Sequence, residues 1–242
     1  QYVYEMFLDE KGEKISKTKG NGISVEDWLK YAPDESLSLF QFQKPRVAKK
    51  LYFDVIPKAV DEYLTFLEKY PGEAPERQIE NPVWHIHSGN PPAETTPVSF
   101  ALLLNLVAVA NPEDKSQLWG FISQYAPEAS PQTHPLLDEL AGYAMRYYQD
   151  FVLPQKTYRA PTEAERAAME DLAARLKAFT DEPSPENLQT LTFSVGKDHG
   201  FENLRDWFKA LYEVLLGQSQ GPRFGSFAAL YGVANTARLI DE

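Results

Sequence analysis

The segment best equipped for chemistry is a lysine- and glycine-rich stretch near the start of the chain. It reads Lys14-Ile15-Ser16-Lys17-Thr18-Lys19-Gly20-Asn21-Gly22. Counted together with Lys11, it places four lysines within nine positions. Lysine ammonium groups on a mobile loop suit phosphate, because each is a compact charge that can be repositioned, and such charges would stabilise a pyrophosphate as it develops in a transition state. A solvated loop without chemistry is the alternative, and the stretch lacks the Gly-x-x-x-x-Gly-Lys-Ser/Thr pattern of a Walker A loop.

A strand and a helix flank this loop and would hold its two ends. Residues 2–8 have the composition of a β-strand. Ser24 and Asp27 have the spacing of a capping box, which predicts a helix that runs through Leu29. No later segment offers an obvious partner for the strand, and a lone strand leaves its backbone groups unsatisfied when it is buried. We therefore expect the rest of its sheet to lie upstream of Gln1.

The remainder of the chain has the pattern of a mainly α protein, with apolar residues at helical spacing and breaks at proline and glycine. Further helices are expected at 35–43, 53–69, 98–110, 114–125, 134–152, 162–179, 185–195, 202–216 and 225–240. Thr162 and Glu165 form a second capping box. Residues 71–97 are rich in proline and are expected to be a connector with little regular structure, apart from a short strand at 83–87.

Composition narrows the class of protein. The 242 residues are 43% hydrophobic and 13% aromatic, which indicates a folded chain with a core. Cysteine is absent, which excludes disulfides and thiolate zinc sites within the chain and fits a reducing cytoplasm. No apolar run reaches the roughly 18 residues of a membrane-spanning helix. The net charge of −11 means that any RNA binding must use local basic patches.

The segment Lys14-Ile15-Ser16-Lys17-Thr18 resembles the KMSKS signature of class I aminoacyl-tRNA synthetases, in the same context of strand, mobile loop, Gly-Asn-Gly and helix. The resemblance implies that Lys17 contacts ATP and stabilises the adenylation transition state, assisted by Lys14 and Ser16, with Mg²⁺ expected in the full enzyme. Thr18 stands where serine is usual and keeps the hydroxyl. The family's HIGH signature is not found here, because residues 85–89 follow the loop and lack its pattern, so we expect it upstream.

Longer segments resemble one branch of this family. Residues 40–46, 48–57, 60–63 and 221–225 are similar to class I lysyl-tRNA synthetases. That family is implied to have a Rossmann-type catalytic domain, a connector that contacts the tRNA stem, and a helical C-terminal domain that binds the anticodon. The parent reaction would form lysyl-adenylate from ATP and lysine and then pass the lysyl group to tRNA(Lys) in the cytoplasm.

The resemblance divides this chain into three parts. Residues 1–30 would be the end of the catalytic domain, a remnant of its Rossmann-type fold that carries the loop. Residues 31–97 would be the stem-contact connector, and residues 98–242 the helical anticodon-binding bundle. We expect the chain by itself to be inactive, because the amino-acid pocket would lie mainly upstream.

Two basic sets are predicted to bind RNA. The first set comprises Lys44, Arg46, Lys49 and Lys50, interleaved with Phe42 and Tyr52. Given the resemblance, phosphate contacts to a tRNA stem would explain this set, and a solvated helix start is the alternative. Arg223 and Phe224 lie in a glycine-flanked turn and could read unpaired anticodon bases by stacking. A helix cap with a packed phenylalanine is the alternative for that pair.

His85 and His87 would share one face of the expected strand and could form half of a metal site. No cysteine is available as a further ligand, so we expect them to have a structural role and expect no metal site. Three other functions stay open: a class I synthetase of another specificity, such as glutamyl; a non-catalytic tRNA-binding helical module with an inert lysine loop; and a helical scaffold for a protein partner.

Overall fold

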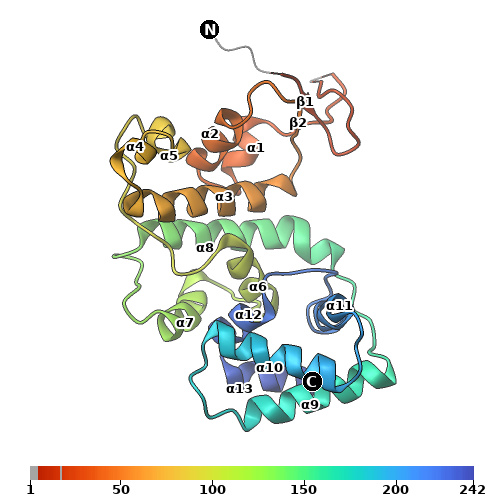
Figure 1. Ribbon diagram of the computed structural model, residues 1–242. Helices are drawn as coiled ribbons and strands as arrows, with labels where there is room; N and C mark the ends of the chain where they lie inside the picture. The colour runs from red at the N-terminus through yellow and green to blue at the C-terminus, as the bar shows by residue number, and fades with distance from the viewer. Residues whose placement is uncertain (1–4, 17) are drawn as a thin grey trace. The chain divides into compact units, whose positions relative to one another are not determined.

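The computed structural model describes residues 5–16 and 18–242. The structure is 60% helical, and the described residues contain one two-stranded sheet, so the prediction of a mainly α chain is confirmed. The chain forms two compact units (Figure 1). Unit 1 comprises the described residues up to 100 together with 131–146, and unit 2 comprises 101–130 and 147–242. None of the helices in the described ranges is long and apolar enough to cross a membrane.

The sheet of unit 1 joins the start of the chain to a later segment. Strand β1 (Phe7–Leu8) pairs in parallel with β2 (Lys49–Lys50), and Glu5 N donates to Pro45 O at 2.8 Å just before the ladder. The strand expected at residues 2–8 is thus shorter in its described part, and residues 2–4 lie outside the described residues. The expectation that β1 has no later partner is wrong, because β1 pairs with β2. This partner was not predicted, since two consecutive lysines do not have the composition of a strand.

Three helices of unit 1 begin and end within two residues of their predicted bounds. They are α1 (Val25–Leu29), α2 (Asp34–Phe42) and α3 (Val55–Lys69), and α2 packs against α3 (Figure 1). The Ser24–Asp27 capping box is confirmed, because Ser24 Oγ accepts from Asp27 N at 3.0 Å and Asp27 Oδ2 accepts from Ser24 N at 3.2 Å. Fully buried Trp28 donates its indole N–H to Ser36 Oγ at 3.0 Å, which joins α1 to α2.

The proline-rich segment is more regular than predicted. It contains the 3₁₀ turn η1 (Tyr70–Gly72) and the short helices α4 (Pro75–Gln78) and α5 (Pro82–Ile86). The short strand expected at 83–87 is wrong. Asn81 caps α5 by accepting from Val83 N at 3.0 Å, and Pro82 occupies the first helical turn, where its missing N–H costs nothing. An apolar pattern of five residues cannot separate a strand from one helical turn.

The helices beyond residue 97 follow the prediction closely. They are α6 (Phe100–Ala110), α7 (Lys115–Tyr125), α8 (Pro135–Tyr147), η2 (Tyr148–Val152), η3 (Leu153–Gln155), α9 (Glu163–Lys177), α10 (Pro185–Asp198), α11 (Leu204–Leu215), α12 (Phe224–Tyr231) and α13 (Val233–Asp241). The helix expected at 134–152 ends in the π-helical segment η2. The helix expected at 225–240 is broken at Gly232, whose φ of 94° is unfavourable for other residues.

A charged cluster fixes the start of α9 in unit 2. Arg159 donates from Nη1 and Nη2 to the two carboxylate oxygens of Glu165 at 2.7 and 2.8 Å, and from Nε to Glu213 on α11 at 2.6 Å. Glu165 also accepts from Thr162 N at 2.8 Å, which confirms the second capping box. The guanidinium of Arg159 lowers the pKa of Glu165 to about 2, against the opposing effect of burial. One arginine thereby joins the segment before α9 to α11.

Helices α10 and α12 approach closely at a glycine. Gly225 N donates to the buried Gln189 side chain at 2.8 Å. A methyl group at Gly225 would lie 2.3 Å from the carbonyl oxygen of Pro185 and 2.5 Å from the backbone nitrogen of Gln189. Both distances are far below van der Waals contact, so only glycine permits this helix pair to pack as it does.

We expect Gly225→Ala to destabilise the chain by about 1–3 kcal/mol, because the methyl group forces α10 and α12 apart. Urea unfolding followed by circular dichroism measures this. Gly120→Ala is the matched control: Gly120 is an exposed residue inside α7 with nothing within 4 Å of its added methyl group. It should stabilise by about 1 kcal/mol through helix propensity alone. Equal stabilisation by both substitutions would contradict the close packing at Gly225.

Candidate functional site

The lysine-rich loop folds back on the strand that precedes it. Lys14 forms an antiparallel bridge with Leu8, and Ile15 N donates to Phe7 O at 3.0 Å. Asp9 N donates to Glu13 O at 2.7 Å, which closes the turn between the two legs. The first half of the loop is therefore a small hairpin held by backbone hydrogen bonds.

A partly buried side-chain pair fixes the second half of the loop. Asn21 Nδ2 donates to Asp9 Oδ2 at 2.7 Å, and Asn21 Oδ1 accepts from Ser16 N at 3.0 Å. Asp9 Oδ1 accepts from Glu13 N at 2.7 Å, and the residue is only 8% exposed. The Asn21 amide and then the Glu13 N–H lower the pKa of the Asp9 carboxyl. We call this pair the Asp9–Asn21 clamp.

Sequence reasoning missed the Asp9–Asn21 clamp. The available signals were an aspartate directly after the strand and an asparagine between two glycines. Both residue types commonly hydrogen-bond to nearby backbone groups in turns. Their pairing with each other depends on the path of the loop between them, which periodicity does not define.

The backbone groups of Lys14 and Ser16 meet at the Asp9–Asn21 clamp, because Asn21 accepts from Ser16 N and its Nδ2 lies 3.3 Å from Lys14 O. Lys17, the central residue of the predicted site, lies outside the described residues. The side chains of Lys11, Lys14 and Lys19 are exposed. Lys19 Nζ is 3.3 Å from Glu13 Oε2, but both side chains are at least 60% exposed, so this pair is weak and leaves the ammonium group accessible to an anion.

A groove of about 600 Å³ lies between the loop and residues 51–53. Lys11 and Lys19 line it together with Asn21 and the aromatic residue Tyr52. The carboxylates of Asp9, Glu10 and Glu13 also line it and would repel phosphate. The groove is large enough for part of a nucleotide, and its charge is mixed. Its residues fit one side of a phosphate site, formed by the lysine ammonium groups.

Two of the four predicted stem-contact residues are used within the chain. Lys49 Nζ donates to Phe40 O at 2.5 Å and to Gln41 O at 3.2 Å, so it satisfies carbonyls at the end of α2. Burial lowers the pKa of Lys49. Lys50 Nζ donates to Glu10 O at 2.8 Å and so contacts the lysine loop. Neither contact was predicted.

The other two stem-contact candidates, Lys44 and Arg46, are exposed in the turn between α2 and β2. Lys44 has a φ of 44°, which is unusual for a residue with a side chain. Lys44 also contributes to the lowered pKa of Lys49, so these two charges lie within electrostatic reach of each other. The turn therefore presents two exposed positive charges.

The two residues predicted to read the anticodon differ in their exposure to solvent. Phe224 is 2% exposed, and its ring packs against Tyr212 and Phe227. Stacking on a base is not possible for this ring as it is placed, and the alternative of a packed phenylalanine fits the structure. The side chain of Arg223 is 59% exposed and lies 3.7 Å from that of Glu186, which is 71% exposed.

His85 lies in α5 and His87 is the residue that caps its C-terminal end, and the two do not share a face. Residues two apart in a helix differ in direction by about 200°, whereas the expected strand would have aligned them. His87 Nε2 lies 3.1 Å from Tyr63 Oη, and His85 stacks on Phe42 with ring centroids 5.1 Å apart. The geometry on which a metal pair depended is therefore absent.

The family of class I tRNA synthetases of the K type matches residues 1–90, which include the lysine loop, the sheet and α1 to α5. This match, which includes the whole lysine loop, indicates a class I synthetase.

Three curated relatives, all called lysine–tRNA ligase, extend the similarity to the whole chain. The protein of Roseobacter denitrificans is 55% identical over 99% of this chain and 45% of its own length. Those of Rickettsia felis and Rickettsia bellii are each 54% identical over 100% of this chain, and 46% and 47% of their own lengths are covered. The chain belongs to the class I lysyl-tRNA synthetase family and spans about half the length of these relatives.

We expect Asn21→Ala to raise the pKa of Asp9, because it removes the strongest hydrogen bond that lowers it. An Asp9 pKa below the ordinary value of about 3.9 stabilises the fold above that pH, and the contribution is lost as pH falls through the folded-state pKa. In the variant this contribution should be smaller, and its loss should be complete at a higher pH. Titration of the Asp9 carboxyl carbon by NMR measures both proteins.

Lys19→Ala is the control for this prediction. It removes the exposed ion pair with Glu13 and leaves the Asp9–Asn21 clamp in place, so the Asp9 pKa should stay low. An unchanged Asp9 pKa in Asn21→Ala would show that the Asp9–Asn21 clamp does not form.

Proposed function

We propose that this chain supplies the ATP-stabilising loop and the tRNA-binding part of a cytoplasmic lysine–tRNA ligase. Such an enzyme forms lysyl-adenylate from ATP and lysine and passes the lysyl group to tRNA(Lys). The observation that carries this proposal is the 55% identity over 99% of the chain to the lysine–tRNA ligase of Roseobacter denitrificans. Identity at this level over nearly the whole chain favours a shared specificity over a glutamyl or other class I type.

In this proposal Lys17 contacts the phosphates of ATP, and Lys14 and Ser16 assist it. A lysine ammonium group stabilises the charge that develops on the leaving pyrophosphate. Mg²⁺, when bound, would add further neutralisation of the phosphates. The Asp9–Asn21 clamp supports this role, because it ties the start of the loop to its end. The residues between would then close over ATP as one segment.

The proposed tRNA contacts fall on both units. In residues 31–97, the exposed Lys44 and Arg46 contact backbone phosphates of the stem. Lys49 and Lys50 also belong to this proposed contact set, and both side chains donate to carbonyl groups of the chain itself.

The anticodon-binding role is proposed for residues 98–242. Arg223 contacts the RNA there, and the buried Phe224 positions the turn that presents it. Residues 1–30 contribute to the catalytic domain through the lysine loop.

A chimera tests the proposed activity. This chain would replace the matched segment of the Roseobacter denitrificans ligase, and pyrophosphate exchange and tRNA charging would be measured with a panel of amino acids. Lysine-dependent exchange and charging of tRNA(Lys) are expected. Activity with glutamate would indicate another specificity. Salt-dependent tRNA retention without exchange would indicate a non-catalytic tRNA-binding module. The absence of both tRNA retention and exchange would indicate a helical scaffold.

In the active chimera we expect Lys17→Ala to slow pyrophosphate exchange by about 10²- to 10³-fold, the typical loss for one group that stabilises transition-state charge. The affinity for tRNA should change little, because the loop acts on ATP. Lys69→Ala is the control, since Lys69 is an exposed lysine at the end of α3 that does not line the groove, and exchange should be unchanged in this variant. Unchanged exchange in Lys17→Ala would remove the proposed role of the loop.

A further inference from the structure

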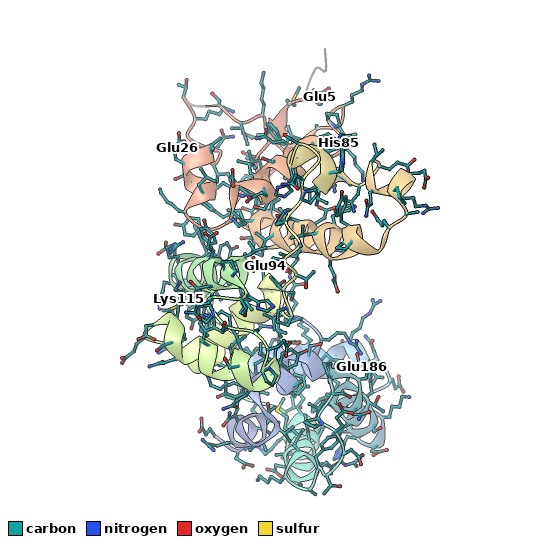
Figure 2. The ribbon with its side chains drawn as sticks, turned by 90° about the vertical axis from the view of Figure 1, so that its left-hand side faces the viewer. Glu5, Glu26, His85, Glu94, Lys115 and Glu186 are labelled. Carbon is teal, nitrogen blue, oxygen red and sulfur yellow. The ribbon has the colours of Figure 1, made fainter. Side chains whose placement is uncertain are left out.

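An aromatic stack is exposed on the surface of unit 1. Phe42 ends α2 and is 41% exposed. His85, labelled on α5 in Figure 2, is also exposed, and its ring lies nearly parallel to that of Phe42, with centroids 5.1 Å apart and an interplanar angle of 20°. Because α2 packs against α5, the two rings are presented by neighbouring helices.

A third aromatic ring, that of Trp84, contacts this stack at His85. Trp84 meets His85 edge to face, with centroids 5.0 Å apart and an angle of 83°. The indole rests on Gly89, where an added methyl group would lie 3.3 Å from the ring. Gly89 N donates to Trp84 O at 2.7 Å, which closes the end of α5. The aromatic platform, defined as Phe42, Trp84 and His85, is therefore fixed in place.

Positive charge lies directly beside the aromatic platform. The chain passes from Phe42 into the turn that carries the exposed Lys44 and Arg46. Neither of these two side chains has an ion pair with any described residue of the chain. Acidic residues also occur in this region: Glu5 N donates to Pro45 O within the turn, and Glu62 acts on Lys49. The turn therefore places two exposed cations close in sequence to Phe42, in a chain of net charge −11.

We propose that Phe42 and His85 stack with one unpaired base of a bound tRNA, while Lys44 and Arg46 contact the flanking phosphates. This inference rests on the proposed tRNA role and adds a base-binding site that the basic residues alone do not provide. Paired bases in an RNA helix are already stacked and present only their edges, whereas an unpaired base offers its ring face to an aromatic side chain. Stacking of this kind is tolerant of sequence, and the phosphate contacts give it orientation.

The aromatic variants test the platform through tRNA affinity. Filter binding of the 242-residue chain to a tRNA(Lys) transcript would compare wild type, Phe42→Leu, Phe42→Tyr and His85→Ala. Phe42→Leu and His85→Ala should each weaken binding by about tenfold, and Phe42→Tyr should retain it because the ring is kept. Unchanged affinity in Phe42→Leu, with tRNA binding intact in wild type, overturns the platform and leaves the proposed function standing. Equal losses in Phe42→Leu and Phe42→Tyr would also overturn it, since a structural role would explain both.

Fluorescence of Trp84 gives a readout that does not depend on tRNA. Trp28, Trp119 and Trp207 are buried and Trp84 is partly exposed, so a base stacked on the platform should change mainly the Trp84 signal. A short single-stranded oligoribonucleotide should quench it, and the same sequence in a duplex should not. Quenching that persists in Phe42→Leu, or that is equal with the duplex, overturns the proposal.

The basic pair is tested separately by salt. Lys44→Gln combined with Arg46→Gln should make the plot of log affinity against log salt concentration less steep, by the amount that corresponds to the loss of about two phosphate contacts. The same change is expected for tRNA and for the single strand. An unchanged slope contradicts the phosphate contacts. If wild type retains no tRNA but the single strand still quenches Trp84 through Phe42, the platform stands and the proposed function fails.

Discussion

The pairing of β1 with β2 is the constraint on which the functional part of unit 1 depends. Two short strands, Phe7–Leu8 and Lys49–Lys50, join the lysine loop to the basic turn that follows α2. The two lysines of β2 then extend to opposite neighbours: Lys49 reaches the end of α2, and Lys50 reaches the loop at Glu10. Backbone pairing and side-chain donation thereby hold the lysine loop and a basic turn in one framework, although they are far apart in sequence.

The cations of this acidic chain serve two purposes that net charge does not distinguish. Arg159 and Lys49 are held by carboxylates or carbonyls and stabilise the fold. Lys14, Lys44 and Arg46 are exposed and available to an anionic ligand. At physiological salt the field of an exposed charge falls off over roughly 8 Å, so the distant carboxylates weaken local phosphate contacts only modestly. A polyanion can therefore be bound by a protein of the same overall sign.

The sequence predicted the features that are encoded locally. Capping boxes at Ser24 and Thr162 and regular apolar spacing gave most helices to within a few residues. Features that depend on partners distant in sequence were missed: β2, which pairs across the chain, and the Asp9–Asn21 clamp. The turn of α5 was mistaken for a strand because five residues carry too little periodicity, and that error placed His85 and His87 on one face. The burial of Phe224 depends on Tyr212 and Phe227, and a turn motif alone does not reveal such packing.

The two compact units are interleaved along the chain. Residues 131–146 belong to unit 1, although the segments on both sides of them belong to unit 2. Neither unit is therefore a continuous stretch of polypeptide, and no single cut releases one unit intact. During synthesis from the N-terminus, unit 1 cannot be completed until residue 146 has been made, when residues 101–130 of unit 2 already exist. Maturation of the two units is thus coupled by the order of the chain itself.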